Sequence, residues 1–192
     1  MRQRGFTLIE LMTGITVLAL ILVSVMPSVA NWLDNTRIRN AADSLQNGLQ
    51  TARGEAIRRN QNMSFWLVAG SDPTVLSNDC TLSSASASWV VSINSPVAHC
   101  ADEASTDSSP MLVVGRAAGG GQVTVSAVKQ DGSAATTVTF DGFGRITNTD
   151  PIRTIDLGGT STRNLRLMIS AAGSVRLCDP SVSDNNDPRK CM

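Results

Sequence analysis

The sequence is poor in the residues on which most enzymes and metal sites depend. Among its 192 residues there is no tyrosine, and histidine occurs once, as His99. A single histidine with no Cys-x-x-Cys spacing does not match the usual zinc ligand sets. The chain also lacks a Gly-x-Ser-x-Gly nucleophile elbow, a P-loop and a dinucleotide-binding fingerprint. We therefore expect no catalytic residues, no metal and no cofactor, and a protein that is not an enzyme.

The chain also has few aromatic side chains and no net charge. Aromatic residues make up 4% of the chain, and none follows residue 144. The C-terminal part therefore has no ring on which a nucleotide base can stack. The formal net charge is zero, but residues 61–144 carry two basic against seven acidic residues, a net charge of −5. Residues 145–192 carry seven basic against five acidic residues, so this end is basic and rich in arginine.

A long apolar run fills the N-terminal part of the chain. From Phe6 to Ala30 the only ionisable side chain is Glu10. The run has the length of a membrane-spanning helix, about 20 residues, and exceeds the core of a signal peptide, about 7 to 15 residues. An ordinary secretory signal, with a small-x-small cleavage site at 28–30, is the alternative. An acidic group at membrane depth costs about 2.5 kcal/mol or more, so we expect Glu10 to have a function.

The first residues resemble a known processing signal. The segment Gly5-Phe6-Thr7-Leu8-Ile9-Glu10-Leu11 resembles the class III leader of type IV pilins and type II secretion pseudopilins. In that family a prepilin peptidase cuts after the glycine and methylates the new N-terminus, which implies cleavage between Gly5 and Phe6. Residues 1–5 would be the leader, and residues 6–30 would stay as a transmembrane segment of the inner membrane. The resemblance implies that Glu10 meets the amino group of Phe6 on a neighbouring subunit, an opposite charge that makes a carboxylate tolerable in lipid.

The helical pattern continues beyond the apolar run, to about residue 60. Apolar residues recur at three- and four-residue steps and predict one buried stripe: Trp32, Leu33, Ile38, Ala41, Ala42, Leu45, Leu49, Ala52 and Ala56. The other face is polar and is expected to face solvent or other subunits: Arg37, Arg39, Asp43, Gln46, Arg53 and Glu55. A helix over 6–60 spans about 80 Å, so its first half must project from a small domain. Pro27 either kinks this helix or separates a membrane helix from a domain helix.

After residue 60 the pattern alternates and turn residues become frequent, which predicts β-strands. The candidates are Met63–Ala69, Ser88–Asn94, Met111–Arg116, Val123–Val128, Thr136–Phe140, Arg153–Leu157, Leu165–Ser170 and Ser174–Leu177. Short connections favour antiparallel pairing, with a tight turn at 141–144 and a hairpin at 171–173. Together with the resemblance, this predicts an α+β, type IV pilin-like fold. A long N-terminal helix packs on an antiparallel sheet or β-sandwich-like domain, residues 61–192, in the periplasm.

Four cysteines, Cys80, Cys100, Cys178 and Cys191, follow the apolar run, and an oxidising periplasm favours disulfides. Of the three pairings, we favour Cys80 with Cys100 and Cys178 with Cys191, because each closes a loop of about 10 to 20 residues, worth about 3 kcal/mol. The segment 183–187 has side-chain oxygens that could hold calcium, but it lacks the EF-hand pattern and its bidentate glutamate. A solvated turn inside the disulfide loop explains it better.

Three segments of the domain resemble the FimT/FimU minor pilins: 140–146, 173–180 and 187–191. The likeness to GspH pseudopilins of type II secretion is weaker. The resemblance implies a low-abundance subunit that primes or tips a pilus, with other major and minor pilins as partners, moving from the inner membrane into the fibre. A pseudopilus subunit for type II secretion is the alternative.

Some FimT-like proteins also bind DNA for natural transformation through a Gly-Arg-x-Arg motif. Here Gly173 and Arg176 align with its ends, but Ser174 replaces the first arginine. Because backbone binding needs clustered cations in no fixed order, other basic side chains could contribute, namely Arg163, Arg166, Arg189 and Lys190. DNA is therefore an alternative partner, and contact with solvent or with other pilins is the simpler role of these side chains.

Overall fold

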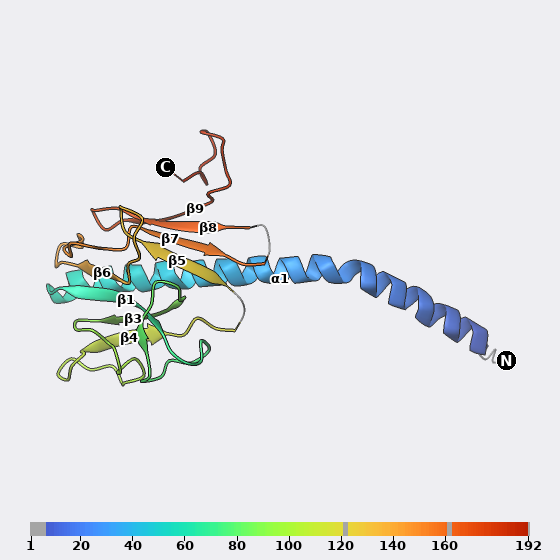
Figure 1. Ribbon diagram of the computed structural model, residues 1–192, viewed down its shortest axis with the longest axis horizontal. Coiled ribbons are helices and arrows are strands. Elements are labelled where there is room, and N and C mark those ends of the chain that lie inside the picture. The colour runs from blue at the N-terminus through green and yellow to red at the C-terminus, as the bar shows by residue number, and fades with distance from the viewer. Residues whose placement is uncertain (1–6, 121–122, 161–162, 192) are drawn as a thin grey trace.

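One long helix dominates the fold, and the computed structural model describes residues 7–120, 123–160 and 163–191. Helix α1 (Leu8–Arg59) has 52 residues, starts at the N-cap Thr7 and ends at Asn60 in the left-handed conformation. Two arginines in its last turn, Arg58 and Arg59, suit the negative end of the helix dipole. The first half of α1 projects from the domain and the second half runs along it, as its predicted length requires (Figure 1).

Two antiparallel sheets follow the helix. The first contains β1 (Met63–Ala69), β2 (Thr81–Leu82), β3 (Ser88–Ser92), β4 (Leu112–Arg116) and β6 (Thr137–Phe140). The second has the order β5 (Thr124–Val128), β7 (Thr154–Gly158), β8 (Leu165–Ile169) and β9 (Val175–Cys178). The predicted α+β fold with antiparallel strands is confirmed, and each of the eight predicted strands is present with ends shifted by at most two residues.

Strand β2 is the one that the sequence did not predict. It has two residues, both exposed, so neither length nor alternation marks it. It pairs with the end of β1, where Val68 faces Leu82 and Ala69 faces Thr81. The start of β1 pairs with β6, from Met63 with Phe140 to Trp66 with Thr137, while its other edge follows β3. A short pairing of this kind is decided by the neighbouring strand and not by local sequence.

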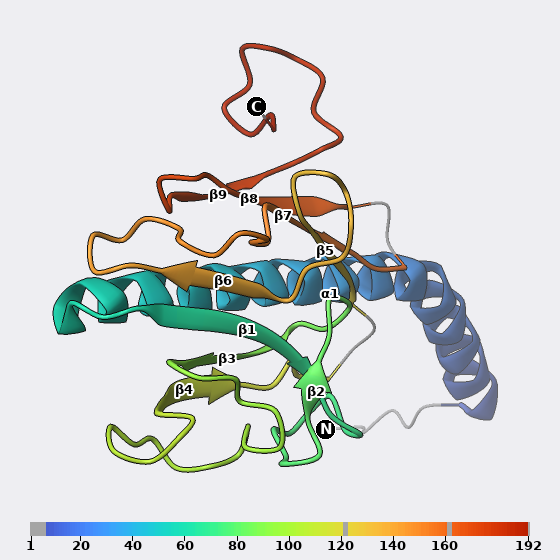
Figure 2. The same cartoon turned by 60° about the vertical axis from the view of Figure 1, so that its left-hand side comes forward.

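The core lies where α1 passes between the two sheets, with β1 on one side and β8 and β9 on the other (Figure 2). The predicted helix stripe is buried from Ile38 to Ala56. It packs against large side chains of both sheets: Phe65, Trp89, Phe140, Ile155, Leu157 and Leu167. Two members of the predicted stripe, Trp32 and Leu33, are 65% and 42% exposed. That part of the prediction is wrong, because these residues lie before the sheets begin to cover the helix.

A second buried cluster covers the other face of the first sheet. It contains Val68, Val90 and Leu112 together with the disulfide between Cys80 and Cys100, whose Cα atoms are 6.2 Å apart. The sheet is therefore covered on both faces, by α1 and by the disulfide-closed loops. This explains why all five residues of β3 are buried, where a strand with one wet face would alternate.

Candidate assembly surface

The start of α1 is closed by a reciprocal pair of side chains. Glu10 Oε2 accepts hydrogen bonds from the backbone N–H and the hydroxyl of Thr7, each at 3.0 Å. The Glu10 N–H in turn donates to Thr7 Oγ1 at 3.3 Å. This is a capping box, which satisfies N–H groups that a helix start leaves unpaired. Gly5 and Phe6, the predicted cleavage site, lie outside the described residues.

The N-terminal half of α1 is bare, in the sense that the domain does not cover it. The large apolar side chains described from Leu8 to Met26 are 55–76% exposed. This part of α1 is long and apolar enough to cross a membrane. The helix continues through Pro27 without a break, and its axis bends on the way to the N-terminus (Figure 1). That Pro27 causes this bend stays a prediction.

A buried carboxylate ties α1 to the domain at the point where the helix enters it. Asp34 is 7% exposed, accepts a hydrogen bond from the hydroxyl of Thr160 and lies 3.8 Å from the guanidinium of Arg37. Thr160 belongs to the connection between β7 and β8. Asp34 was not singled out in the sequence, because a lone aspartate in a polar helix segment carries no signal of burial.

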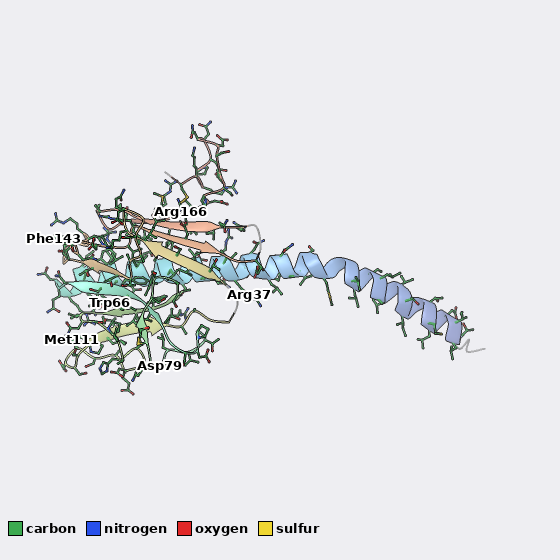
Figure 3. All side chains as sticks on the ribbon, viewed as in Figure 1. Arg37, Trp66, Asp79, Met111, Phe143 and Arg166 are labelled. Carbon is green, nitrogen blue, oxygen red and sulfur yellow. A yellow bond between two sulfur atoms is a disulfide. The ribbon has the colours of Figure 1, made fainter. Side chains whose placement is uncertain are left out.

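The turn at 141–144 lies at the opposite end of the domain from the projecting half of α1 (Figure 3). Asp141 Oδ1 accepts the N–H groups of Phe143 and Arg145, both at 2.9 Å. These backbone hydrogen bonds, that of Arg145 foremost, lower the pKa of Asp141. Phe143 is 76% exposed, with the guanidinium of Arg145 over its ring at 5.2 Å. The turn therefore presents an exposed aromatic ring at the end of the molecule.

Two of the segments that resemble minor pilins meet at this end. Arg53 Nε donates to the carbonyl oxygen of Gly144 at 2.9 Å, and the Ile146 N–H donates to Ala171 O at 3.3 Å. The predicted hairpin is present, with the Gly173 N–H bonded to Ser170 O at 2.9 Å. Arg53 was expected to face solvent or other subunits, but its side chain is half-buried against this turn. The helix end thus holds both loops in one place.

The third segment folds back onto β9. The Asp179 N–H donates to Arg189 O at 2.8 Å, and Cys178 and Cys191 form a disulfide with Cα atoms 5.1 Å apart. Both disulfides join the pairs that the loop lengths favour. Arg176 on β9 donates to the carbonyl oxygens of Pro188 and Lys190, at 2.8 and 3.2 Å. It therefore holds the tail against this strand.

Three of the remaining cations of the proposed DNA site are also engaged. Arg166 forms a bidentate pair with Asp156, at 2.6 and 3.0 Å. Arg189 forms another with Asp187, at 3.1 and 2.6 Å, and holds the pKa of Asp187 at about 2. Lys190 donates to Ser183 O at 3.0 Å and to the side chain of Asn185.

Arg163 is half-buried, and its Nε has no hydrogen-bond partner among the described residues. The five basic side chains lie near β8, β9 and the tail, and four of them form hydrogen bonds with other groups of this chain.

The segment 183–187 also uses its oxygens internally. Asp184 accepts the Asn186 N–H at 2.9 Å, and Asp187 pairs with Arg189. Within the described ranges, no group of three or more His, Cys, Asp or Glu side chains comes together as a metal site.

One functional residue, Thr7, was missed in the sequence although a signal for it was present. The spacing Thr7-x-x-Glu10 is that of a capping box, and it directly precedes an apolar helix. The family resemblance drew attention to the glutamate and left its local partner unnoticed.

Comparison with known proteins supports the architecture. The model of the family described as type II transport protein GspH matches residues 41–173, and that of the prokaryotic N-terminal methylation motif matches residues 1–26. No individually curated protein resembles the chain at a significant level.

Among solved structures, the chain is similar to the type IV minor pilin FimU of Pseudomonas aeruginosa PAO1. One crystal form matches with a TM-score of 0.51 at 15% sequence identity, over 80% of this chain and 97% of FimU. A second form matches with a TM-score of 0.45 at 17% identity, over 77% and 97%. The first likeness shows a shared fold, a long N-terminal helix packed on antiparallel sheets.

Proposed function

The chain belongs to the GspH family, and on that premise we propose that it is a minor type IV pilin, a structural subunit that helps to prime or tip a pilus. The observation that carries the proposal is the methylation motif over residues 1–26, which coincides with the bare half of α1. A helix that is apolar on all sides needs a membrane or other helices around it. Assembly with other pilins supplies those helices once the subunit leaves the lipid.

Glu10 is the proposed assembly residue. In the single chain its carboxylate is occupied by Thr7, which makes it tolerable before assembly. Cleavage by a prepilin peptidase between Gly5 and Phe6 would create a positive N-terminal amine. The amine of a neighbouring subunit is a stronger partner for the carboxylate than the neutral Thr7 groups, because it adds the attraction of an opposite charge to the hydrogen bond. When Glu10 exchanges Thr7 for this amine, the new contact would set the register between subunits.

The domain is proposed to lie in the periplasm before assembly and on the outside of the fibre afterwards. Its two ends differ, with Arg37 beside the membrane helix and Phe143 at the far end (Figure 3). Contacts between unlike ends along a screw axis produce an open filament.

The proposal predicts that Glu10→Ala leaves a membrane protein that no longer enters fibres. Without the carboxylate, nothing attracts the neighbour's amine, and we expect incorporation to fall by at least tenfold. Immunoblots of sheared pili against the membrane fraction measure this loss.

Glu55→Ala is the matched control, because Glu55 lies on the same helix but pairs within its own chain, with Arg58 at 2.6 Å and Arg59 at 2.8 Å. It should enter fibres normally. Normal incorporation of Glu10→Ala at native expression would contradict the proposed role of Glu10.

A pseudopilin of type II secretion is the second candidate, because the matching family model carries that description. The test is a deletion strain: loss of pili with intact secretion supports the pilin, and loss of secretion with intact pili supports the pseudopilin. DNA binding through Arg163, Arg166, Arg176, Arg189 and Lys190 stays a prediction, and their internal contacts do not favour it.

A further inference from the structure

A hollow of about 390 Å³ lies beside α1 near the point where the helix enters the domain. Arg37, Asn40 and Ser44 line it from the helix, and Ser86 and Arg116 line it from the first sheet and its loops. None of the described lining residues is acidic, and two of them are arginines. The chemistry of such a lining suits an anion.

The position of the hollow along the helix places it at the level of a membrane surface. Arg37 is seven residues beyond Ala30, about 10 Å along the helix axis. The headgroup layer extends about 5 to 7 Å beyond the hydrocarbon core, a gap that a long arginine side chain can cross. Between them, Trp32 is 65% exposed, and an exposed indole prefers the headgroup region. Figure 3 shows Arg37 at the end of the domain that faces the membrane helix.

The polar side chains that line the hollow have N–H and O–H donors available for a ligand. The side chain of Arg116 is exposed and makes no hydrogen bond or ion pair with any described residue. Arg37 has a side chain that is 49% exposed, and its contact with Asp34 is long, at 3.8 Å. Both serine hydroxyls already accept a hydrogen bond, Ser44 from the Trp89 indole at 3.0 Å and Ser86 from the Ser88 N–H at 3.1 Å. Their hydroxyl protons are therefore left to donate.

We infer that this hollow binds the phosphate headgroup of an anionic phospholipid while the subunit is in the membrane. Two guanidinium groups supply the charge-assisted hydrogen bonds to the phosphate, and the hydroxyls complete its coordination. Trp32 holds the helix at the depth where the headgroup reaches the site. The inference rests on the proposed membrane-anchored state, and it adds a lipid contact that holds the domain against the surface before assembly.

The test uses the purified full chain in a neutral detergent. Short-chain phosphatidylglycerol, short-chain phosphatidylcholine and inorganic phosphate are titrated separately, and the thermal unfolding midpoint is followed, since a ligand of the folded state raises it. We expect phosphatidylglycerol alone to raise the midpoint. Arg116→Gln should weaken its apparent affinity about fivefold, and the double variant with Arg37→Gln on the order of 20-fold.

Arg145→Gln is the matched control, because Arg145 is also exposed, with a side chain 65% accessible, but lies near Phe143 at the far end. It should respond like the native chain. Equal effects of the two lipids, a full response to phosphate alone, or native affinity in Arg116→Gln would each overturn the inference. The assay is independent of fibres, so its failure leaves the Glu10 experiment intact, and the reverse also holds.

Discussion

At the scale of single residues, two close approaches depend on the absence of a side chain. A Cβ on Gly48 would lie 2.7 Å from the Trp89 ring and 2.8 Å from the Phe65 ring, so this glycine lets α1 approach the first sheet. A Cβ on Gly173 would lie 2.1 Å from the carbonyl oxygen of Gly144, and Gly173 has a φ of +80°. The hairpin can approach the turn at 141–144 this closely because Gly173 has no side chain.

We therefore predict that Gly173→Ala destabilises the protein by about 3 kcal/mol or more. The left-handed conformation alone costs about 1 to 3 kcal/mol for a residue with a side chain, and the collision with a backbone oxygen adds to it. Gly132→Ala separates the two effects, since its φ is +85° but its Cβ would meet nothing within 4 Å. Thermal unfolding in detergent measures both variants, and equal losses would show that the collision contributes nothing.

At the scale of elements, side-chain hydrogen bonds and not regular structure organise the loop between β1 and β2. Asp79 accepts the Ser71 N–H at 3.0 Å and the Ser77 hydroxyl, and it directly precedes the disulfide at Cys80. Hydrogen bonds from Ser71 and Ser77 lower the pKa of Asp79 from 3.8 to about 2. The charged form thus stabilises the folded loop.

This shift predicts a pH dependence of stability with a definite sign. The pKa is lower in the folded state, so the contribution of Asp79 is complete above about 4 and is lost as the pH falls towards about 2. We expect the unfolding midpoint of Asp79→Asn to fall less than that of the native chain when the pH is lowered from about 5 to about 2. Glu103→Gln, at an exposed side chain in a neighbouring loop, should follow the native curve. Parallel curves for Asp79→Asn and the native chain would contradict the assignment.

At the scale of the whole molecule, the two disulfides have different consequences. Cys80–Cys100 is part of a buried cluster that covers the first sheet, whereas Cys178–Cys191 closes a tail that stands away from the core (Figure 1). A tail of this kind can open locally while the core remains folded. The two disulfides close loops of similar length, but they therefore do not contribute equally to the stability of the domain.

We predict that the double variant Cys80→Ala and Cys100→Ala lowers the unfolding midpoint by about 10 °C, from about 3 kcal/mol of loop closure at roughly 2 to 4 °C per kcal/mol. Cys178→Ala with Cys191→Ala should lower it by less than about 3 °C. Hydrogen exchange should then show lost protection only over residues 179–190. A loss of protection throughout the core in the tail variant would show that the tail is part of the cooperative unit.

The family resemblance and the local patterns predicted much of this protein. The apolar run, the helical steps from Ile38 to Ala56 and the alternating segments after residue 60 each depend on neighbours close in sequence, and the structure contains them nearly as predicted. The short spacing of the cysteines likewise pointed to the pairs that the structure joins. Such features can be predicted because one helix face or one strand is sufficient to produce them.

Tertiary structure alone decided the features that depend on partners distant in the chain. Asp34 is buried because Thr160 reaches it, Arg53 turns inward because Gly144 offers a carbonyl oxygen, and Arg176 is occupied by the tail. Charge counts cannot foresee this, since the same arginine is a free cation or an internal donor according to which backbone lies beside it. The sequence by itself therefore determined a pilin-like fold with an apolar N-terminal helix, and the folded structure decided which of its charges remain available for a partner.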